Sequence, residues 1–242
     1  MPKNPLTGNT GYMRGKLIVL DGTDGSGKDT QTDLLLKSAQ KRGLSAAVIR
    51  FPSHGETFSG RVIRDEYLTG KLGDLAVCHP KLICYLYAVD RFEQQASLNQ
   101  LLASHDLVIA TRYVISNIAY QAARIPELDR AEFRKWAEEL DYDVMKNPKE
   151  DAVVFLSLPV DLATQLIEKR NAGKQVSRDL HDENKSYQRD ILHEYQTLCA
   201  SHDHWYQIDC ESNGAIRTID DIAQELDRLV FEQILVSEEV PV

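Results

Sequence analysis

The sequence predicts an α/β fold in which five parallel strands form one sheet with helices on both of its faces. Three observations predict it. Short apolar runs alternate with longer segments of helical periodicity, which is typical of βαβ units. The first apolar run ends at a glycine-rich loop that opens a helix. The 242 residues are enough for one large domain with a well-buried core, so a single domain is favoured over two small ones.

Five apolar runs have the length expected of strands. The first, KLIVLD, is continuously apolar in its middle, as in a parallel strand that is buried on both faces. Pro52 ends the second run, because proline cannot donate a ladder hydrogen bond. The predicted strands are 16–21, 46–51, 107–110, 152–158 and 205–208.

Helical spacing of apolar residues fills the segments between these strands. The first helix ends at Lys41, Arg42 and Gly43, because cations favour the last turn of a helix and glycine favours the position after it. The predicted helices run through about 34–39, 80–103, 129–140, from 159 onward, 187–198 and 216–235.

Composition excludes several classes of function. The 37 acidic residues outnumber the 28 basic ones, and a net charge of -9 argues against binding a nucleic acid backbone. No apolar run approaches the roughly 20 residues of a membrane span. The four cysteines form no CxxC pair, and we expect free thiols in a reducing cytoplasm. We expect His202 and His204 to be solvated rather than metal ligands.

The expected organisation is a single domain at 16–236 with short segments on either side. Residues 1–15 are polar, lack the apolar core of a signal peptide, and are interpreted as a lead-in to the first strand. Residues 237–242 are interpreted as a frayed tail.

Residues 22–28, GTDGSGK, match the G-x-x-x-x-G-K spacing of a phosphate-binding loop. The loop follows a strand and opens a helix, which is the context that makes the match credible. The glycines let successive backbone N–H groups point at phosphate oxygens, and the helix N-terminus adds partial positive charge. Lys28 can reach the β- and γ-phosphates of ATP. The sequence therefore predicts a three-layer P-loop fold that binds a nucleoside triphosphate.

The position after Lys28 departs from the usual pattern. A Ser or Thr there normally ligates Mg²⁺ through its hydroxyl, but this chain has Asp29 followed by Thr30. Either Thr30 substitutes from one position along, or Asp29 holds the metal through water. Both residues remain candidate Mg²⁺ ligands.

Several motifs occur in an order that resembles the thymidylate kinases. They are LIVLDGTDGSGKDTQ, RFPS, YAVDRFEQ, TRYVISNIAYQ and ENKSYQ, and together they cover about residues 14 to 209. The resemblance implies phosphorylation of dTMP to dTDP with ATP and Mg²⁺, in the biosynthesis of dTTP. It also implies a homodimer, for which we find no independent apolar stripe in the sequence.

The resemblance assigns one group of residues to the acceptor nucleotide. Asp24 would hold the sugar 3′-hydroxyl, although a carboxylate inside an anion site could also be an ordinary loop acid. Tyr87 would stack on the pyrimidine, with Phe51 packing beside the base. Arg91 would hold the monophosphate or the base edge, since its planar fork pairs with such groups; otherwise Arg91 is a solvated helix residue.

The TRYVISNIAYQ segment lies where open α/β sheets bind ligands, at the carboxyl end of a strand. By resemblance, Arg112 would contact the acceptor phosphate, Ser116 and Gln121 would line the base pocket, and Tyr120 would sit against the sugar. The family has aspartate where this chain has Thr111, and that residue commonly sits near Mg²⁺ or the reacting phosphates. We assign no role to His54, near which the family has an arginine or a glycine pair.

The polar segment 171–183 corresponds to the family's lid over ATP. Family members supply a catalytic arginine either from the phosphate loop or from the lid, and since Gly25 follows Asp24 here, the resemblance implies that the lid supplies the cation. Arg178 is the best candidate and Lys174 the second, and a solvated charged loop is the alternative. Arg170 would stack on adenine, and the loop 209–213 would border it.

The candidate residues fall into three overlapping groups. Those predicted to act in catalysis are Lys28, Arg112 and Arg178. Those predicted to bind ATP are Gly22, Gly25, Ser26, Gly27, Lys28, Asp29, Thr30 and Arg170. Those predicted to bind dTMP are Asp24, Phe51, Tyr87, Arg91, Arg112, Ser116, Tyr120 and Gln121.

Two other functions stay open on the sequence alone. One is a kinase of the same fold that acts on another nucleoside monophosphate, which the residues at 29, 54 and 111 keep possible. The other is a non-catalytic P-loop protein, against which the intact Lys28 stands. A regulatory GTPase is disfavoured because the chain has no Asn-Lys-x-Asp guanine motif.

Overall fold

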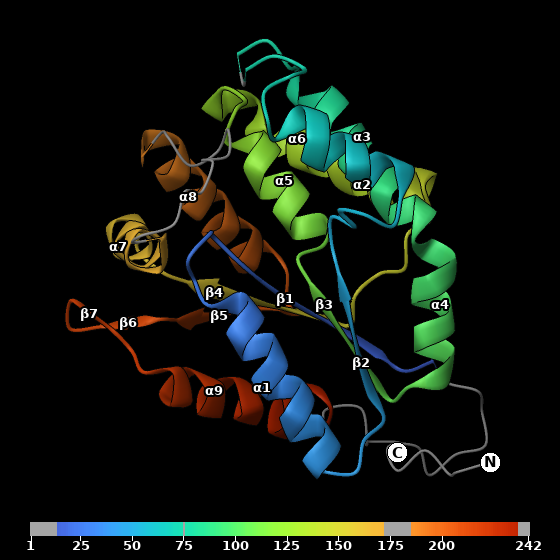
Figure 1. The fold of residues 1–242 in the computed structure, drawn as a ribbon, viewed down its shortest axis with the longest axis vertical. Coiled ribbons are helices and arrows are strands. Elements are labelled where there is room, and N and C mark those ends of the chain that lie inside the picture. The colour runs from blue at the N-terminus through green and yellow to red at the C-terminus, as the bar shows by residue number, and fades with distance from the viewer. Residues whose placement is uncertain (1–13, 75, 172–184, 237–242) are drawn as a thin grey trace.

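A computed structural model describes residues 14–74, 76–171 and 185–236, with only the backbone described at 170 and 171. Its centre is a five-stranded parallel sheet in the order β2-β3-β1-β4-β5, with helices on both faces (Figure 1). The strands are β1 (Lys16–Gly22), β2 (Ala46–Arg50), β3 (Leu107–Thr111), β4 (Ala152–Ser157) and β5 (Trp205–Asp209). The predicted parallel α/β architecture is confirmed.

The sheet separates two hydrophobic cores, because successive residues of each strand point to opposite faces. On β1, Leu17 and Val19 belong to one core, while Ile18 and Leu20 belong to the other. By the same alternation, Asp21 points to the face of Leu17 and Val19. Thr111 on β3, which pairs with Leu20, points to the face of Ile18 and Leu20. This alternation decides which helices each polar residue meets at the carboxyl edge of the sheet.

Helices α3 (Pro80–Glu93), α4 (Gln95–Ser104), α5 (Val114–Ala122), α6 (Arg130–Glu138) and α8 (Lys185–Ser201) contribute to the core on the Leu17 face. Helices α1 (Lys28–Lys41), α7 (Val160–Asn171) and α9 (Ile219–Arg228) contribute to the core on the Ile18 face (Figure 1). The shorter helices are α2 (Phe58–Val62), η1 (Ile63–Tyr67), η2 (Glu127–Asp129), η3 (Glu139–Val144) and η4 (Leu229–Ile234).

Three elements differ from the sequence prediction. The helix expected at 80–103 is two helices that meet at Gln94. Helix α5 was not predicted, although its apolar residues at 114, 115, 118, 119 and 122 recur at helical spacing, and all nine of its residues are buried. A two-stranded antiparallel hairpin, β6 (Glu211–Ser212) and β7 (Ala215–Ile216), follows β5 and projects from the body of the molecule (Figure 1).

The cysteines and histidines that the sequence singled out are structural. All four cysteines are free. The expectation that His202 and His204 are solvated was wrong, because His202 stacks on Trp205 with ring centroids 3.9 Å apart and His204 packs against the same ring. No group of three or more metal-binding side chains occurs among the described residues, and none of the helices described is long and apolar enough to span a bilayer.

Candidate active site

The phosphate loop connects β1 to α1 at the carboxyl edge of the sheet. Gly27 precedes α1 with φ of 86°, a left-handed backbone conformation that glycine adopts without steric cost. Gly22 stands where the loop approaches its neighbours closely, since a Cβ there would lie 2.5 Å from the Ser26 hydroxyl oxygen and 2.8 Å from the Leu156 carbonyl oxygen. These two glycines let the chain curl tightly around the N-terminus of α1.

Buried polar atoms without partners concentrate around this loop. Thr23 Oγ1, Ser26 Oγ and Gln31 Oε1 are buried and make no hydrogen bond among the described residues. Desolvated polar atoms usually have partners, because an unsatisfied one costs roughly 1–3 kcal/mol. These three atoms surround the N-terminus of α1, where backbone N–H groups and the helix dipole favour an anion such as a polyphosphate.

Lys28 is the first residue of α1 and is buried, with 8% of its surface exposed. Its Nζ donates to the Thr23 carbonyl oxygen and to Asp24 Oδ1, each at 3.3 Å. Burial and the neighbouring Arg112 lower the pKa of Lys28. The ammonium group is therefore held inside the loop rather than in solvent.

Asp24 is the centre of a charged cluster. Its Oδ1 accepts from Arg112 Nη2 at 2.5 Å and from Lys28, and its Oδ2 accepts from the Tyr120 hydroxyl at 3.1 Å. Burial by itself would raise the pKa of Asp24, but Arg112 and Lys28 outweigh burial and hold that pKa well below its usual range. The structure thus brings together four residues that the sequence assigned to phosphate and acceptor binding.

Arg112 has an unusual backbone conformation directly after β3. Its φ is 60°, in the left-handed region that side chains other than glycine rarely adopt. Its N–H donates to the Leu20 carbonyl oxygen at 3.1 Å, and its guanidinium lies 5.3 Å from the centre of the Tyr120 ring. Strain of this kind is found at functional sites, where the surrounding structure holds the residue in place.

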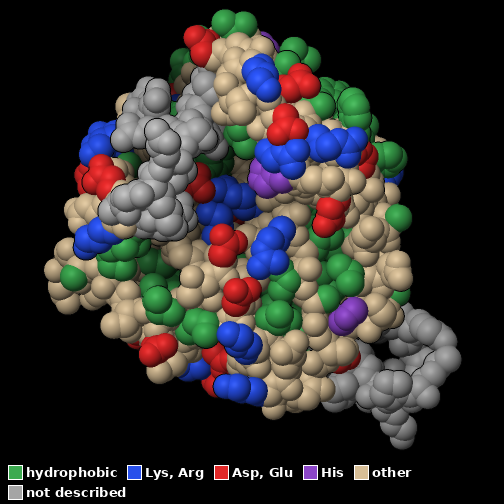
Figure 2. All heavy atoms as spheres, viewed as in Figure 1, with side chains coloured by type: hydrophobic (Ala, Val, Ile, Leu, Met, Phe, Trp, Pro, Cys, Tyr) green, Lys and Arg blue, Asp and Glu red, His purple; other side chains and the backbone are tan. Residues whose placement is uncertain are grey.

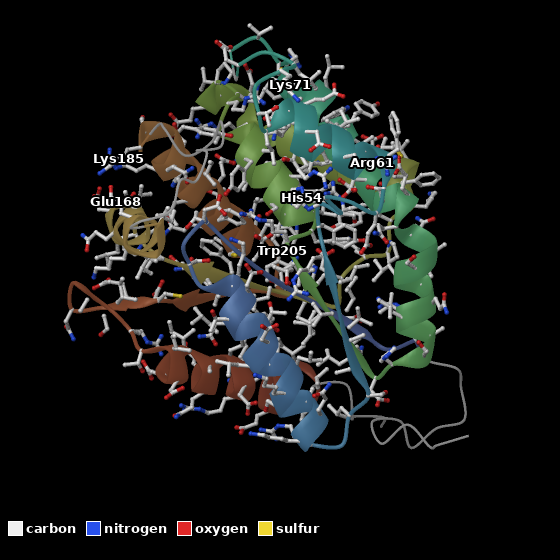
Figure 3. The ribbon with its side chains drawn as sticks, in the orientation of Figure 1. His54, Arg61, Lys71, Glu168, Lys185 and Trp205 are labelled. Atoms are coloured by element: carbon white, nitrogen blue, oxygen red, sulfur yellow. The ribbon has the colours of Figure 1, made fainter. Side chains whose placement is uncertain are left out.

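These residues line one cavity of about 710 Å³. Figure 2 shows it as a hollow beside the grey atoms, with charged side chains at its floor and rim. The phosphate loop and α1 contribute Asp24, Gly25, Gly27, Lys28, Asp29 and Thr30, and the ends of β2 and β3 contribute Arg50, Phe51, Thr111 and Arg112. His54, which is labelled in Figure 3, also lines it from the loop that follows β2. Gly22 and Ser26, which were predicted to bind ATP, are buried residues of the loop and are not part of this lining.

The sequence of this chain is similar to those of known proteins. The sequence model of the thymidylate kinases matches residues 20–220. The chain belongs to the thymidylate kinase family. It is 32% identical over 174 residues to a thymidylate kinase of Mycobacterium tuberculosis, covering 72% of this chain and 78% of that relative. It is 28% identical over 230 residues to that of Danio rerio, covering 95% and 96%.

A solved thymidylate kinase structure supports the fold. The enzyme from Candida albicans superposes with a TM-score of 0.64 at 24% sequence identity, covering 90% of this chain and 91% of that one. The parallel sheet with helices on both faces is therefore the thymidylate kinase fold.

The structure narrows the roles that the family resemblance gave to the residues predicted to contact the base. Arg91 lines the cavity but is only 2% exposed, and its Nε and Nη2 donate to the two carboxylate oxygens of Asp141 at 2.8 and 2.7 Å. The third nitrogen, Nη1, donates to the Tyr113 carbonyl oxygen at 3.5 Å. Arg91 is thus neither a solvated helix residue nor a guanidinium with its whole fork available.

Two other residues predicted to contact the base use their side chains in hydrogen bonds within the protein. The Ser116 hydroxyl accepts from Arg112 Nη1 at 3.1 Å and donates to Asp21 Oδ1 at 2.9 Å, so it supports the charged cluster rather than facing a base. The Gln121 carbonyl oxygen accepts from Arg124 at 2.6 Å. Its amide nitrogen is the atom that could donate to a ligand.

Tyr87 and Phe51 supply aromatic surface to the part of the cavity where the base is predicted to bind. Both line the cavity. Tyr87 meets Tyr67 edge-on with ring centroids 6.2 Å apart, and Phe51 packs against Tyr113 at 5.3 Å. These contacts hold the rings without filling the cavity, so a flat base has apolar faces to lie against.

Sequence reasoning missed Asn117 and Asp21. Asn117 lines the cavity, its Nδ2 donates to the Cys84 carbonyl oxygen at 3.0 Å, and its buried Oδ1 has no partner among the described residues. Asp21 lies at the end of β1, fully buried on the side of α5 and α8. The signal for Asp21 was available, because a carboxylate that ends an apolar strand just before a phosphate loop requires a buried partner.

Some predicted residues cannot be compared with the structure. Arg178, Lys174 and nearly all of the expected lid at 171–183 lie outside the described residues, as does the side chain of Arg170. The loop 209–213 forms the end of β5 and the start of the hairpin and does not line the cavity.

Proposed function

We propose that this chain transfers the γ-phosphoryl group of ATP to dTMP, yielding dTDP and ADP. The observation that carries the proposal is that the phosphate loop and the cluster of Asp24, Arg112 and Tyr120 face one cavity. A donor site and an acceptor site must adjoin for an in-line transfer between phosphates, because catalysis of this reaction is mostly positioning and charge stabilisation. Membership of the thymidylate kinase family supports the choice of acceptor.

Each charged residue has a distinct part in this reaction. Lys28 and the backbone N–H groups of the loop bind the β- and γ-phosphates of ATP. Arg112 binds the acceptor phosphate, whose oxygen attacks the γ-phosphorus while the bond to the β-phosphate oxygen breaks. Asp24 accepts a hydrogen bond from the sugar 3′-hydroxyl, as the family resemblance implies. In the lid, Arg178 is our candidate for neutralising the charge that develops on the transferred group.

The base end of the cavity favours a pyrimidine with an N–H at position 3. Stacking on Tyr87 hardly distinguishes bases, so discrimination must come from polar atoms. The unpaired Asn117 Oδ1 can accept from that N–H, and the Gln121 amide can donate to a carbonyl oxygen of the base. A base without matching groups leaves these buried atoms unpaired, and a site of this kind rejects it strongly.

We expect dTMP to be the preferred acceptor, dUMP to be weaker, and purine monophosphates to be poor. The difference between dTMP and dUMP is one methyl group, worth roughly 1–3 kcal/mol. Steady-state rates with ATP and each acceptor measure this order. A preference for a purine or for cytidylate would refute the thymidylate assignment but leave the kinase assignment intact, and absence of transfer to every acceptor would favour a non-catalytic nucleotide-binding protein.

The residues at the start of α1 fit a Mg²⁺ ion bound mainly by phosphates and water. Asp29 and Thr30 are exposed to the cavity, and Thr111 lines it from β3 with its hydroxyl 3.2 Å from that of Thr32. One carboxylate is sufficient for an ion that keeps several waters. Mg²⁺ would neutralise charge on the β- and γ-phosphates, and Asp29 would orient its water ligands.

We therefore expect activity to require a divalent cation and to be lost when the cation is chelated. We expect Thr111→Asp to raise turnover severalfold, because it adds a second carboxylate beside the same phosphates. Thr69→Asp, on an exposed turn outside the cavity, is the control. Turnover that is insensitive to added Mg²⁺ would show that the metal assignment is wrong.

We also propose that the chain forms a homodimer through α3. The sequence shows no unusual apolar stripe, but in the structure Leu82, Tyr85 and Phe92 of α3 are 68%, 43% and 51% exposed and recur at helical spacing. Phe58 on the neighbouring α2 is also exposed, at 68%. Apolar side chains gathered on one helix face mark an interface, and a two-fold dimer pairs such a face with its own copy.

We expect Leu82→Glu to convert the dimer to a monomer, because it places a charge in the centre of a buried apolar contact. Leu128→Glu is the matched control, since Leu128 is 96% exposed on η2 away from the stripe. Sedimentation velocity of the parent and both variants measures the result. A parent protein that sediments as a monomer, or a Leu82→Glu dimer, would contradict the proposed interface.

A further inference from the structure

Asp21 is a buried carboxylate to which the proposed reaction gives no direct part. It is 0% exposed and lies below the cavity floor, at the end of β1. Its Oδ1 accepts from the Gly22 N–H at 2.7 Å, from the Ser116 hydroxyl at 2.9 Å and from the Tyr195 hydroxyl at 3.0 Å. Its Oδ2 has no partner among the described residues. A charged group so placed is costly, so its surroundings must use it.

Asp21 is connected to Arg112 through a single residue, Ser116. The Ser116 hydroxyl that donates to Asp21 also accepts from Arg112 Nη1 at 3.1 Å, while Arg112 Nη2 binds Asp24 at 2.5 Å. The guanidinium is therefore held at both terminal nitrogens, one by Asp24 and the other by Ser116. Asp21 fixes the direction in which the Ser116 hydroxyl presents its lone pairs.

Helix α8 makes this support rigid. The Tyr195 hydroxyl lies 2.9 Å from that of Ser116 as well as contacting Asp21. The Tyr195 ring is itself fully buried and stacks on Phe155 of β4, with centroids 4.6 Å apart and planes 4° apart. The carboxylate is thus positioned from the sheet and from α8 independently.

Asp21 is also the second carboxylate beside two cations. Lys28 and Arg112 share a single carboxylate, Asp24, by direct contact. Burial raises the pKa of Asp21, while the positive charges of Arg112 and Lys28 act on it in the opposite direction.

We propose that Asp21 is a positioning residue that acts through Ser116 to hold the guanidinium of Arg112 where the acceptor phosphate binds. This inference rests on the proposed function and deepens it, because it names the group that sets the acceptor site without touching the acceptor. Substitution of Asp21 acts more strongly on the acceptor nucleotide than on ATP, to which Asp21 is connected only through the Gly22 N–H of the phosphate loop.

A double-mutant cycle tests the proposal. In the parent background, Asp21→Asn keeps the shape, replaces the carboxylate by an amide, and raises the KM for dTMP at least tenfold, a larger change than that in the KM for ATP. In an Arg112→Ala background, the same substitution changes the KM for dTMP less than twofold, because the group that Asp21 positions is already absent. Equal effects in both backgrounds, or no effect in either, would overturn the proposal.

A matched control separates this role from burial of an acid in general. Glu150 is 5% exposed and accepts from the Tyr142 hydroxyl and from Trp205, labelled in Figure 3, as Asp21 accepts from Tyr195. It lies outside the cavity lining. Glu150→Gln leaves the KM for dTMP within twofold of the parent. A rise equal to that of Asp21→Asn would show a general structural effect and overturn the proposal.

A second variant covers the case in which Asp21→Asn does not fold. Ser116→Ala leaves Asp21 in place and removes the bridge to Arg112, and it raises the KM for dTMP at least fivefold at unchanged KM for ATP. An unchanged KM for dTMP would overturn the proposal. Activity of the parent enzyme separates the proposed function from the role of Asp21. A parent that fails to phosphorylate dTMP refutes the proposed function, whereas an active parent whose variants keep the same KM for dTMP refutes the role of Asp21.

Discussion

Lys28→Ala is expected to lower turnover by roughly 10²–10³-fold with the fold intact, the size of effect seen when one preorganised charge-stabilising donor is removed. Lys28 carries its charge at the N-terminus of α1, inside the loop that binds the donor phosphates. The fold should survive because Asp24, the acid that Lys28 contacts, keeps its bonds to Arg112 and Tyr120. No carboxylate is therefore left buried without a partner.

The measurement is steady-state turnover with ATP and dTMP, together with thermal unfolding. Lys41→Ala is the matched control, because Lys41 is the last residue of the same helix and is exposed to solvent. The control should match the parent in both measurements. Turnover of Lys28→Ala within a few-fold of the parent would contradict a catalytic phosphate loop.

Arg112→Ala is expected to lower kcat/KM for dTMP by at least about 10²-fold, which corresponds to roughly 2.7 kcal/mol of lost transition-state binding. Arg112 is the residue whose guanidinium joins Asp24, Ser116 and the ring of Tyr120. Its planar fork can bind phosphate oxygens while keeping the contacts that orient it. Affinity for ATP should change little, because Lys28 and the loop are untouched.

The backbone of Arg112 offers a second, independent measurement. At φ of 60°, alanine is strained and glycine is not, so Arg112→Gly should unfold at a higher temperature than Arg112→Ala, by a difference of about 1 kcal/mol in the free energy of unfolding. Both variants should be equally poor with dTMP. Equal stability would show that the left-handed conformation is not maintained in solution, and near-parent activity of either variant would contradict the acceptor-phosphate role.

Residues close together in sequence could be placed correctly from the sequence alone. The strand–loop–helix order around 22–28 predicts a phosphate loop because spacing within one loop determines its geometry. The contact between Asp24 and Lys28 spans four residues of one loop, in which Asp24 was assigned to the acceptor and Lys28 to the donor phosphates. The five strands were recognised because a buried parallel strand is a short, nearly continuous apolar run.

Predictions were wrong where burial is set by distant parts of the chain. Helix α5 is covered on every side, so that even Ser116, Asn117 and Gln121, which the spacing of its apolar residues would place on a solvent face, are buried. The apolar stripe of α3 was missed for the opposite reason, since apolar residues on a helix are expected to face the core, and only the packed structure shows that Leu82 and Phe92 face solvent.

The sequence by itself determined the parallel α/β fold, the phosphate loop at the carboxyl edge of the sheet, and many of the residues that line the cavity beside it. Only the tertiary structure decided how those residues share their hydrogen bonds. It pairs Arg91 with Asp141, fifty positions away, and joins Asp21 to Tyr195, 174 positions away. Propensity and periodicity act over a few turns of chain, whereas a buried charge takes whichever partner the packing of distant elements brings within about 3 Å.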